Sequence, residues 1–216
     1  MSSALMGVCF CFIHPPFSNV SMRVVSPQAV RNLGSLAARA HGLAGTVPSH
    51  QAYILLHSQH SPRSFPSRVA SPLLVALQQR ALRWSALVNI AWVPQNGVER
   101  APNLSEDTNA TETYNLLAFS RDRARLQVSS VSMDSLEDAC AQLDDFLGHP
   151  TRSTVDPDAV YLYVCTHGAR DCRCGEWGSK VADALREEIL KRKASEPTGK
   201  YSRIVVGEVG HVGGHE

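Results

Sequence analysis

Cysteine and histidine gather in two short segments near the C-terminal end of the chain. The first segment reads Cys165-Thr-His-Gly-Ala-Arg-Asp-Cys-Arg-Cys174, and the second reads His211-Val-Gly-Gly-His215. Crowded cysteines of this kind indicate metal or redox chemistry more often than a framework of structural disulfides. Thiolate and imidazole ligands together suit zinc, iron and copper, so the residue types alone leave the metal open.

The spacing of the cysteines bears on this choice. Zinc sites with two cysteines and two histidines usually space the cysteines by two to four residues, whereas eight residues separate Cys165 from Cys174. A binuclear iron–sulfur cluster is the alternative, and a Zn²⁺ site is kept as a second hypothesis. Thiol oxidoreduction through Cys172 and Cys174 is a third, although this Cys-x-Cys pair in an expected loop differs from a Cys-x-x-Cys pair at a helix start.

Two strands and a helix are expected to position these segments. The run Val160 to Val164 predicts a buried strand before the cysteine segment, and Ile204 to Val206 predicts another before the histidine segment. Ser179 is expected to cap the helix between them. Parallel neighbours joined by a helix bring their carboxyl ends together, and ligands bind there in open α/β sheets. The thiolates and imidazoles are therefore expected to converge.

The preceding part of the chain shows its own pattern of elements. Apolar runs, caps and turns predict strands at residues 52–57, 87–93, 116–120 and 126–131, with helices that start at Ser71-Pro72 and at Ser135. The last two strands are expected to form a hairpin, and the second helix is expected to end at Gly148. This order of strand, helix, three strands and helix is that of a thioredoxin-like core.

The chain is therefore expected to be an α/β protein with two thioredoxin-like domains, the second incomplete at the C-terminus. Residues 46–148 form a degenerate first domain, residues 149–158 a linker, and residues 159–216 the truncated second domain. The second domain supplies two strands and one helix, so we expect an open sheet edge and an uncovered face. Its cluster is expected to be labile, and its tail from His211 onward mobile.

Residues 1–45 differ in composition from the rest of the chain. They contain Arg23, Arg31 and Arg39 and no acidic residue. Such a segment resembles a mitochondrial presequence, and a flexible extension is the alternative, so the expected location is mitochondrial or cytoplasmic. The apolar run Ala4 to Ile13 is too short for a transmembrane helix, and no membrane partner is expected.

The charges are divided unevenly along the sequence. Residues 1–98 carry seven arginines, no lysine and no acid, whereas residues 99–216 hold all 20 acidic residues against 14 basic ones. The arginines are scattered and lack the basic stripe with interleaved aromatics of a nucleic-acid site. The sequence shows no Rossmann glycine pattern or Walker loop. We therefore expect no nucleic-acid partner, and a separate redox partner protein or reductase.

The two segments together resemble those of the sucrase/ferredoxin-like family, whose members are thioredoxin-like ferredoxins. The pattern Cys-Thr-His-Gly-x-Arg-Asp-x-x-Cys-Gly, followed by His-Val-Gly-Gly-His, carries the resemblance. The segments Gly45 to His57, Ser71-Pro72 and Asn89-Ile-Ala-Trp92 extend it over residues 43–215.

The resemblance implies a [2Fe-2S] cluster held by four residues, namely Cys165, Cys174, His211 and His215. The protein is then a carrier in electron transfer or a redox sensor more than an enzyme. His167 and Arg170 are expected to tune the cluster, with Cys172 as a spare or resolving thiol. The first domain is expected to be a scaffold, with His57 and His60 as solvated loop histidines.

Overall fold

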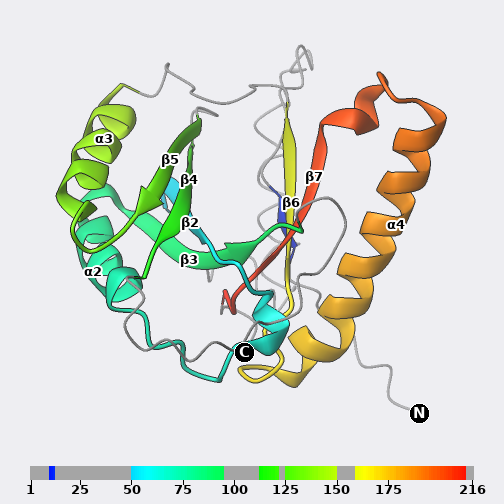
Figure 1. The fold of residues 1–216 in the computed structure, drawn as a ribbon, viewed down its shortest axis with the longest axis horizontal. Helices are drawn as coiled ribbons and strands as arrows, with labels where there is room; N and C mark the ends of the chain where they lie inside the picture. Colours follow the sequence, from blue (N-terminus) through cyan, green and yellow to red (C-terminus); the bar gives the residue numbers. More distant parts are fainter. Residues whose placement is uncertain (1–9, 13–49, 95–111, 122–124, 150–158, 213–216) are drawn as a thin grey trace, which may run out of the picture.

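A computed structural model describes residues 10–12, 50–94, 112–121, 125–149 and 159–212. These residues form one mixed sheet with the strand order β1-β6-β7-β3-β2-β4-β5, together with three α-helices (Figure 1). The strands are β1 (Phe10–Phe12), β2 (Ala52–His57), β3 (Ala86–Trp92), β4 (Tyr114–Ser120), β5 (Arg125–Val131), β6 (Val160–Cys165) and β7 (Ile204–Val209). The helices are α2 (Pro72–Ala81), α3 (Leu136–Gly148) and α4 (Ser179–Ser195). Short helical turns are η1 (Pro62–Ser64), η2 (Leu82–Trp84), η4 (Cys174–Gly178) and η5 (Lys200–Arg203).

The helices lie where the sequence predicts them, but two of their caps differ. α2 begins as predicted, because the Ser71 hydroxyl accepts a hydrogen bond from the backbone N–H of Leu74. The Ser135 hydroxyl instead accepts from the N–H of Ser132 and makes no capping bond to α3. Ser179 does not cap α4, because helical conformation already precedes it in η4. The cap predictions at Ser135 and Ser179 are therefore wrong.

One sheet joins the two halves of the chain, namely the first half with β2 to β5 and the second half with β6 and β7. β2 pairs in parallel with β3 and antiparallel with β4, and β4 forms the predicted hairpin with β5. β6 pairs in parallel with β7, and β7 pairs antiparallel with β3 through Ala91–Val209 and Trp92–Glu208. The α/β class is confirmed, whereas the two thioredoxin-like domains are not confirmed. Residues 150–158 of the predicted linker lie outside the described residues.

The strands of the C-terminal region have neighbours on both sides. β7 pairs with β3, and β6 pairs antiparallel with β1. The expectation of an open edge next to these two strands is therefore wrong. β1 belongs to residues 1–45, and the rest of that segment lies outside the described residues, as do residues 213–216 of the tail.

The helices cover the outer faces of the sheet, as Figure 1 shows. α2 and α3 pack on β2–β5 around a core that includes Ile54, Leu77, Leu116 and Leu143. α4 packs on β6 and β7 at the opposite side of the molecule. No helix in the described part of the chain combines the length and the apolar character needed to cross a membrane.

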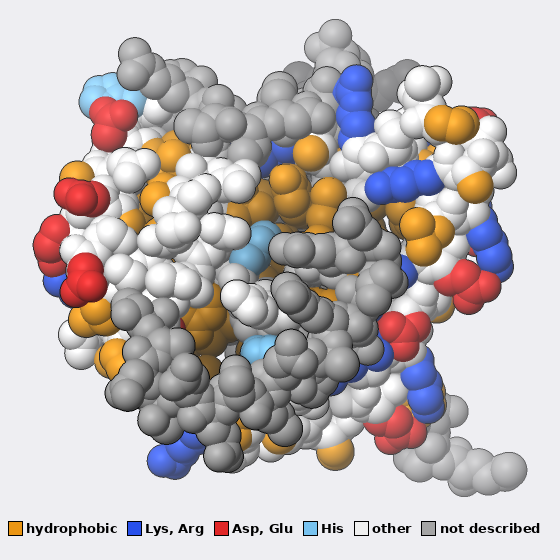
Figure 2. Space-filling model, in the orientation of Figure 1, with side chains coloured by type: hydrophobic (Ala, Val, Ile, Leu, Met, Phe, Trp, Pro, Cys, Tyr) orange, Lys and Arg blue, Asp and Glu red, His pale blue; other side chains and the backbone are white. Residues whose placement is uncertain are grey.

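The inner faces of the two sheet halves pack against each other. The rings of Tyr161 and Tyr163 on β6 lie 5.3 and 6.5 Å from the ring of Phe119 on β4, measured between centroids. Leu55 and Val209 belong to the same buried cluster. In Figure 2 hydrophobic side chains gather in the hollow between the two helical sides. The sequence leads us to expect that one face of the second domain is uncovered. This expectation is thus wrong, because residues of β2 and β4 in the first half pack against the inner face of β6 and β7.

His57 ends β2 within this inner interface. Its Nε2 lies 2.8 Å from the hydroxyl of Tyr163. Burial lowers the pKa of His57 to about 4, so its ring is neutral at neutral pH. Burial also raises the pKa of Tyr163. The prediction that His57 is a solvated loop histidine is wrong, whereas His60 is exposed as predicted.

Candidate metal centre

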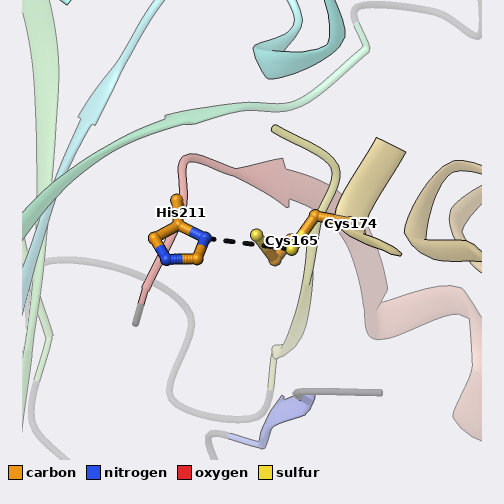
Figure 3. Close-up of side chains that lie close together, drawn as sticks. All are labelled: Cys165, Cys174 and His211. Atoms are coloured by element: carbon orange, nitrogen blue, oxygen red, sulfur yellow. Dashed lines mark hydrogen bonds between the residues drawn. The ribbon is translucent and has the colours of Figure 1, made fainter. Parts of the chain in front are cut away.

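The cysteine and histidine segments meet at the carboxyl ends of β6 and β7. Cys165 is the last residue of β6 and pairs in register with Val209, the last residue of β7. His211 follows Val209 by two positions, and Cys174 begins η4, the turn that leads into α4. The parallel pairing places both segments at one edge of the sheet, as the sequence predicts (Figure 3).

Three potential ligand atoms lie close together there. The Sγ atoms of Cys165 and Cys174 and a ring nitrogen of His211 all lie within 4.8 Å of one another. The dashed line in Figure 3 joins Cys174 Sγ to His211 Nδ1 at 3.9 Å. Both cysteines are buried free thiols, and His211 is half-buried. This arrangement can hold a metal ion or supply part of a larger metal centre.

The Cys174 thiol is strongly favoured in its protonated form. Burial is the main cause, followed by the hydrogen bond with Cys165, and together they raise the pKa of Cys174 to about 12. Attacking thiols of oxidoreductases have lowered pKa values. A cation among these side chains stabilises thiolates and reverses the effect. In the absence of a bound cation, Cys174 therefore lacks the lowered pKa of an attacking thiol.

Cys172 and Cys174 lie in a helical run and not in a loop, which corrects the prediction. Cys172 is exposed and Cys174 is buried, so the pair does not share one environment.

Gly178 allows η4 to approach the end of β6 closely. A Cβ atom at this position would lie 2.0 Å from the carbonyl oxygen of Cys165.

His167 is buried beside the three potential ligands. Its Nε2 donates a hydrogen bond to the carbonyl oxygen of Pro66 at 2.9 Å. Its Nδ1 accepts one from the backbone N–H of His211 at 3.4 Å. These two bonds define the tautomer with the proton on Nε2. His167 therefore orients the histidine segment, and both of its nitrogens are already used.

The model of one protein family, described as sucrase/ferredoxin-like, matches residues 43–216. The chain belongs to the sucrase/ferredoxin-like family. The match includes both the cysteine and the histidine segment, and it confirms the resemblance seen in the sequence. Comparisons with curated proteins and with solved structures found no match.

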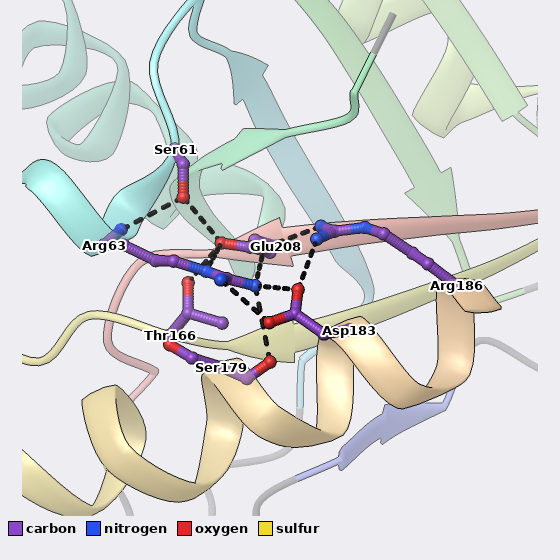
Figure 4. Close-up of polar contacts among 7 residues, drawn as sticks. All are labelled: Ser61, Arg63, Thr166, Ser179, Asp183, Arg186 and Glu208. Atoms are coloured by element: carbon purple, nitrogen blue, oxygen red, sulfur yellow. Dashed lines mark hydrogen bonds and ion pairs between the residues drawn. The ribbon is translucent and has the colours of Figure 1, made fainter. Parts of the chain in front are cut away.

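A buried carboxylate of this sucrase/ferredoxin-like chain lies next to the site (Figure 4). Glu208 of β7 is fully buried. It accepts hydrogen bonds from Ser61 at 2.6 Å, from Arg63 at 2.7 Å and from Thr166 at 2.8 Å. Arg186 of α4 adds an ion pair with an N–O distance of 2.7 Å. We call these five residues the Glu208 cluster.

The Glu208 cluster connects the two ligand segments with the first half of the chain. Thr166 directly follows Cys165, and Glu208 precedes His211 by three residues. Arg63 comes from η1, in the first half. Burial works to raise the pKa of Glu208, but the hydrogen bonds from Arg63 and its other partners outweigh burial and lower the pKa. The carboxylate is therefore charged at neutral pH.

Sequence reasoning missed Glu208. The sequence pattern ends the strand at Val206, whereas β7 continues to Val209 and includes this residue. A single carboxylate within the otherwise apolar run Ile204–Val209 was the signal available. A charge at such a position is seldom buried without a partner, so it predicts a buried cation nearby.

The structure brings together three of the four ligands that the resemblance implies, namely Cys165, Cys174 and His211. His215 lies outside the described residues, and its ligation stays a prediction. Of the expected neighbours, His167 lies beside the site, whereas Arg170 and Cys172 are exposed. The expected tuning by Arg170 also stays a prediction.

Proposed function

We propose that this chain binds a [2Fe-2S] cluster through Cys165, Cys174, His211 and His215, and that it acts in electron transfer or redox sensing. The observation that carries the proposal is the convergence of two buried thiols and the His211 imidazole within 4.8 Å. Two cysteines with two histidines are a ligand set of binuclear clusters. Membership of a ferredoxin-like family agrees with an iron–sulfur centre.

The residues of the chain give such a centre a fixed and partly dry setting. Cys165 and Cys174 belong to the buried inner cluster between the two sheet halves. His211 is half-buried, so this side of the site reaches the surface. When bound, a [2Fe-2S] cluster takes up and releases one electron. A reductase or other redox partner would then approach the cluster from the surface next to His211.

A single Zn²⁺ ion in a binding module is the second candidate, and one distance favours it. A thiolate and an imidazole on one tetrahedral Zn²⁺ lie about 3.5 Å apart, from bond lengths of about 2.3 and 2.0 Å. Cys174 Sγ and His211 Nδ1 are 3.9 Å apart, close to this value. In a [2Fe-2S] cluster the cysteines would bind one iron and the histidines the other, so a thiolate and an imidazole would not share one metal ion.

Metal and sulfide analysis of anaerobically purified full-length chain decides between the two. The cluster gives two irons and two acid-labile sulfides per chain, a coloured protein and an EPR signal after reduction. A zinc module gives one zinc ion, no colour and no EPR signal. One zinc per chain without sulfide would overturn the proposal.

A ligand exchange tests the role of His211 in the cluster. His211→Cys is expected to keep the cluster and lower its reduction potential, because a thiolate donates more negative charge to iron than an imidazole does. Protein-film voltammetry of the wild type and the variant measures this difference. An unchanged potential would mean that His211 is not a ligand.

A further inference from the structure

Asn89 lies on β3, in the other half of the chain, and its side chain reaches the histidine segment. Its Nδ2 donates hydrogen bonds to the carbonyl oxygens of Gly210, at 3.1 Å, and of His211, at 3.3 Å. Its Oδ1 accepts a bond from the backbone N–H of Ile90 at 2.8 Å. Only one orientation of the amide satisfies all three contacts.

The backbone of Gly210 packs directly on this side chain. The ladder between β3 and β7 ends at Ala91 and Val209, although the N–H of Gly210 still donates to the carbonyl oxygen of Ile90 at 2.8 Å. A Cβ atom at position 210 would lie 2.7 Å from Asn89 Oδ1, so a side chain would push the two apart. Beyond Val209 the ladder between β3 and β7 has ended. Hydrogen bonds from the Asn89 side chain thus hold the backbone of Gly210 and His211 against β3.

His211 is consequently held at both of its backbone polar groups. Its N–H donates to His167 Nδ1 at 3.4 Å, and its carbonyl oxygen accepts from Asn89. The two partners come from different segments, so they fix the peptide units on either side of the His211 Cα. Only the side-chain torsions then remain to direct the imidazole toward the thiols.

We propose that Asn89 is a positioning residue for His211 as a metal ligand. The inference rests on the proposed metal centre and adds to it a residue from the other half of the chain. Asn89 is not itself a ligand in this proposal. It fixes the backbone that presents the imidazole toward Cys165 and Cys174. Loss of its hydrogen bonds leaves the thiols in place and releases the imidazole.

Titration of the full-length, reduced and metal-free chain with Co²⁺ tests this role. Thiolate-to-cobalt absorption reports the cysteines, and the titration reports the affinity. Asn89→Ala removes the amide, and Asn89→Asp keeps its size but cannot donate to the two carbonyl oxygens. Both variants are expected to weaken Co²⁺ binding about tenfold or more, as partners of metal ligands typically do, and to keep the thiolate absorption at saturation.

A matched control comes from another strand. Asn115 of β4 also accepts a backbone N–H, from Ser130, and β2 and β3 separate β4 from β7 in the sheet. Asn115→Ala is expected to leave Co²⁺ affinity unchanged. Circular dichroism of each variant verifies that the chain is folded before titration.

A double-mutant comparison separates positioning from general loosening of the fold. His211→Ala leaves no imidazole at this position, so Asn89→Ala is expected to change Co²⁺ affinity less than about twofold in that background. An equal loss in both backgrounds would overturn the proposal, because Asn89 would then act through something other than His211.

The results also distinguish this inference from the metal centre itself. A wild-type chain that is purified without iron, sulfide or zinc and that gives no thiolate-to-cobalt absorption contradicts the metal centre. Normal wild-type binding, with unchanged affinity in both Asn89 variants, contradicts only the role of Asn89. Hydrogen exchange of the metal-free chain adds a second readout, in which the amides of Gly210 and His211 are expected to exchange faster in Asn89→Ala than in Asn115→Ala. Equal exchange in the two variants counts against the positioning role.

Discussion

Position in the fold distinguishes the cysteines that can act as ligands from the others. Cys165→Ser and Cys174→Ser are each expected to abolish metal binding, because a hydroxyl is a poor ligand where a thiolate is required. Cys140→Ser and Cys172→Ser are expected to leave binding largely intact, since Cys140 belongs to α3 and lies in the core that α3 forms with β2–β5, and Cys172 is exposed. Metal content per folded chain measures the difference. A comparable loss in Cys172→Ser would show that the ligand assignment is wrong.

Glu208→Gln tests the charge at the centre of the Glu208 cluster. The glutamine leaves Arg63 and Arg186 beside a neutral amide, and Arg186 is largely buried. Removal of one partner from a buried ion pair typically costs about 3 kcal/mol or more. The free energy of unfolding from urea titration is expected to fall by this amount.

An exposed ion pair provides the control for this variant. Glu187 and Lys191 pair at 2.7 Å on the surface of α4. Glu187→Gln is expected to leave the urea midpoint unchanged, because exposed pairs contribute little to stability. If Glu208→Gln behaves like Glu187→Gln, the Glu208 cluster does not stabilise the fold.

The contact between η4 and β6 depends on a glycine at the end of the turn. Gly178→Ala places a Cβ atom 2.0 Å from the carbonyl oxygen of Cys165, so the turn or the strand end must move. Lower thermal stability and weaker Co²⁺ binding are expected. Gly148→Ala is the control, because nothing lies within 4 Å of its Cβ position at the end of α3. Equal stability of the two variants would mean that η4 has room to shift.

Local signals predict some element boundaries and fail at others. Ser71 and Pro72 act on the first turn of α2 alone, so the sequence is enough to place its start. The helical run that includes α4 begins before Ser179, where Gly178 lies against the carbonyl oxygen of Cys165 at the end of β6. Ser179 has the right residue type for a cap, but it lies inside a helical run that begins earlier.

The same distinction applies to the site. The approach of Cys165 and His211 could be predicted, because parallel neighbouring strands share one carboxyl edge whatever surrounds them. The contacts of Asn89, Arg63 and Glu208 could not be predicted, because they join segments from both halves of the chain. No local spacing in the sequence marks such pairs.

The interface between the two halves of the molecule is expected to be sensitive to acid through His57. Its pKa is lowered to about 4 in the folded chain, against 6.5 in the unfolded chain. As pH falls below 6.5 the unfolded chain binds a proton that folded His57 does not, so stability falls until pH reaches about 4. The expected loss of unfolding free energy between pH 7 and pH 5 is about 2 kcal/mol.

Urea unfolding of the reduced chain in chelator, at pH 7 and pH 5, measures this loss. His57→Gln is expected to show a smaller difference between the two pH values, and His60→Gln, at an exposed histidine, the same difference as the wild type. Glu208 contributes at lower pH, because its pKa is lowered and its stabilisation is lost only as pH falls through that value. An identical pH response in His57→Gln and the wild type would exclude His57 as the source.

The ribosome synthesises the two sides of the β3–β7 junction at well-separated times. β2, β4 and β5 have all their strand partners within residues 52–148, and β3 has one of its two there, so this half can fold while the rest of the chain is still being made. The pairs Ala91–Val209 and Trp92–Glu208 can form only after β7 has left the exit tunnel. If the site binds metal as proposed, its ligands therefore come together only after β7 has been made, and metal binding would report that β7 has joined β3.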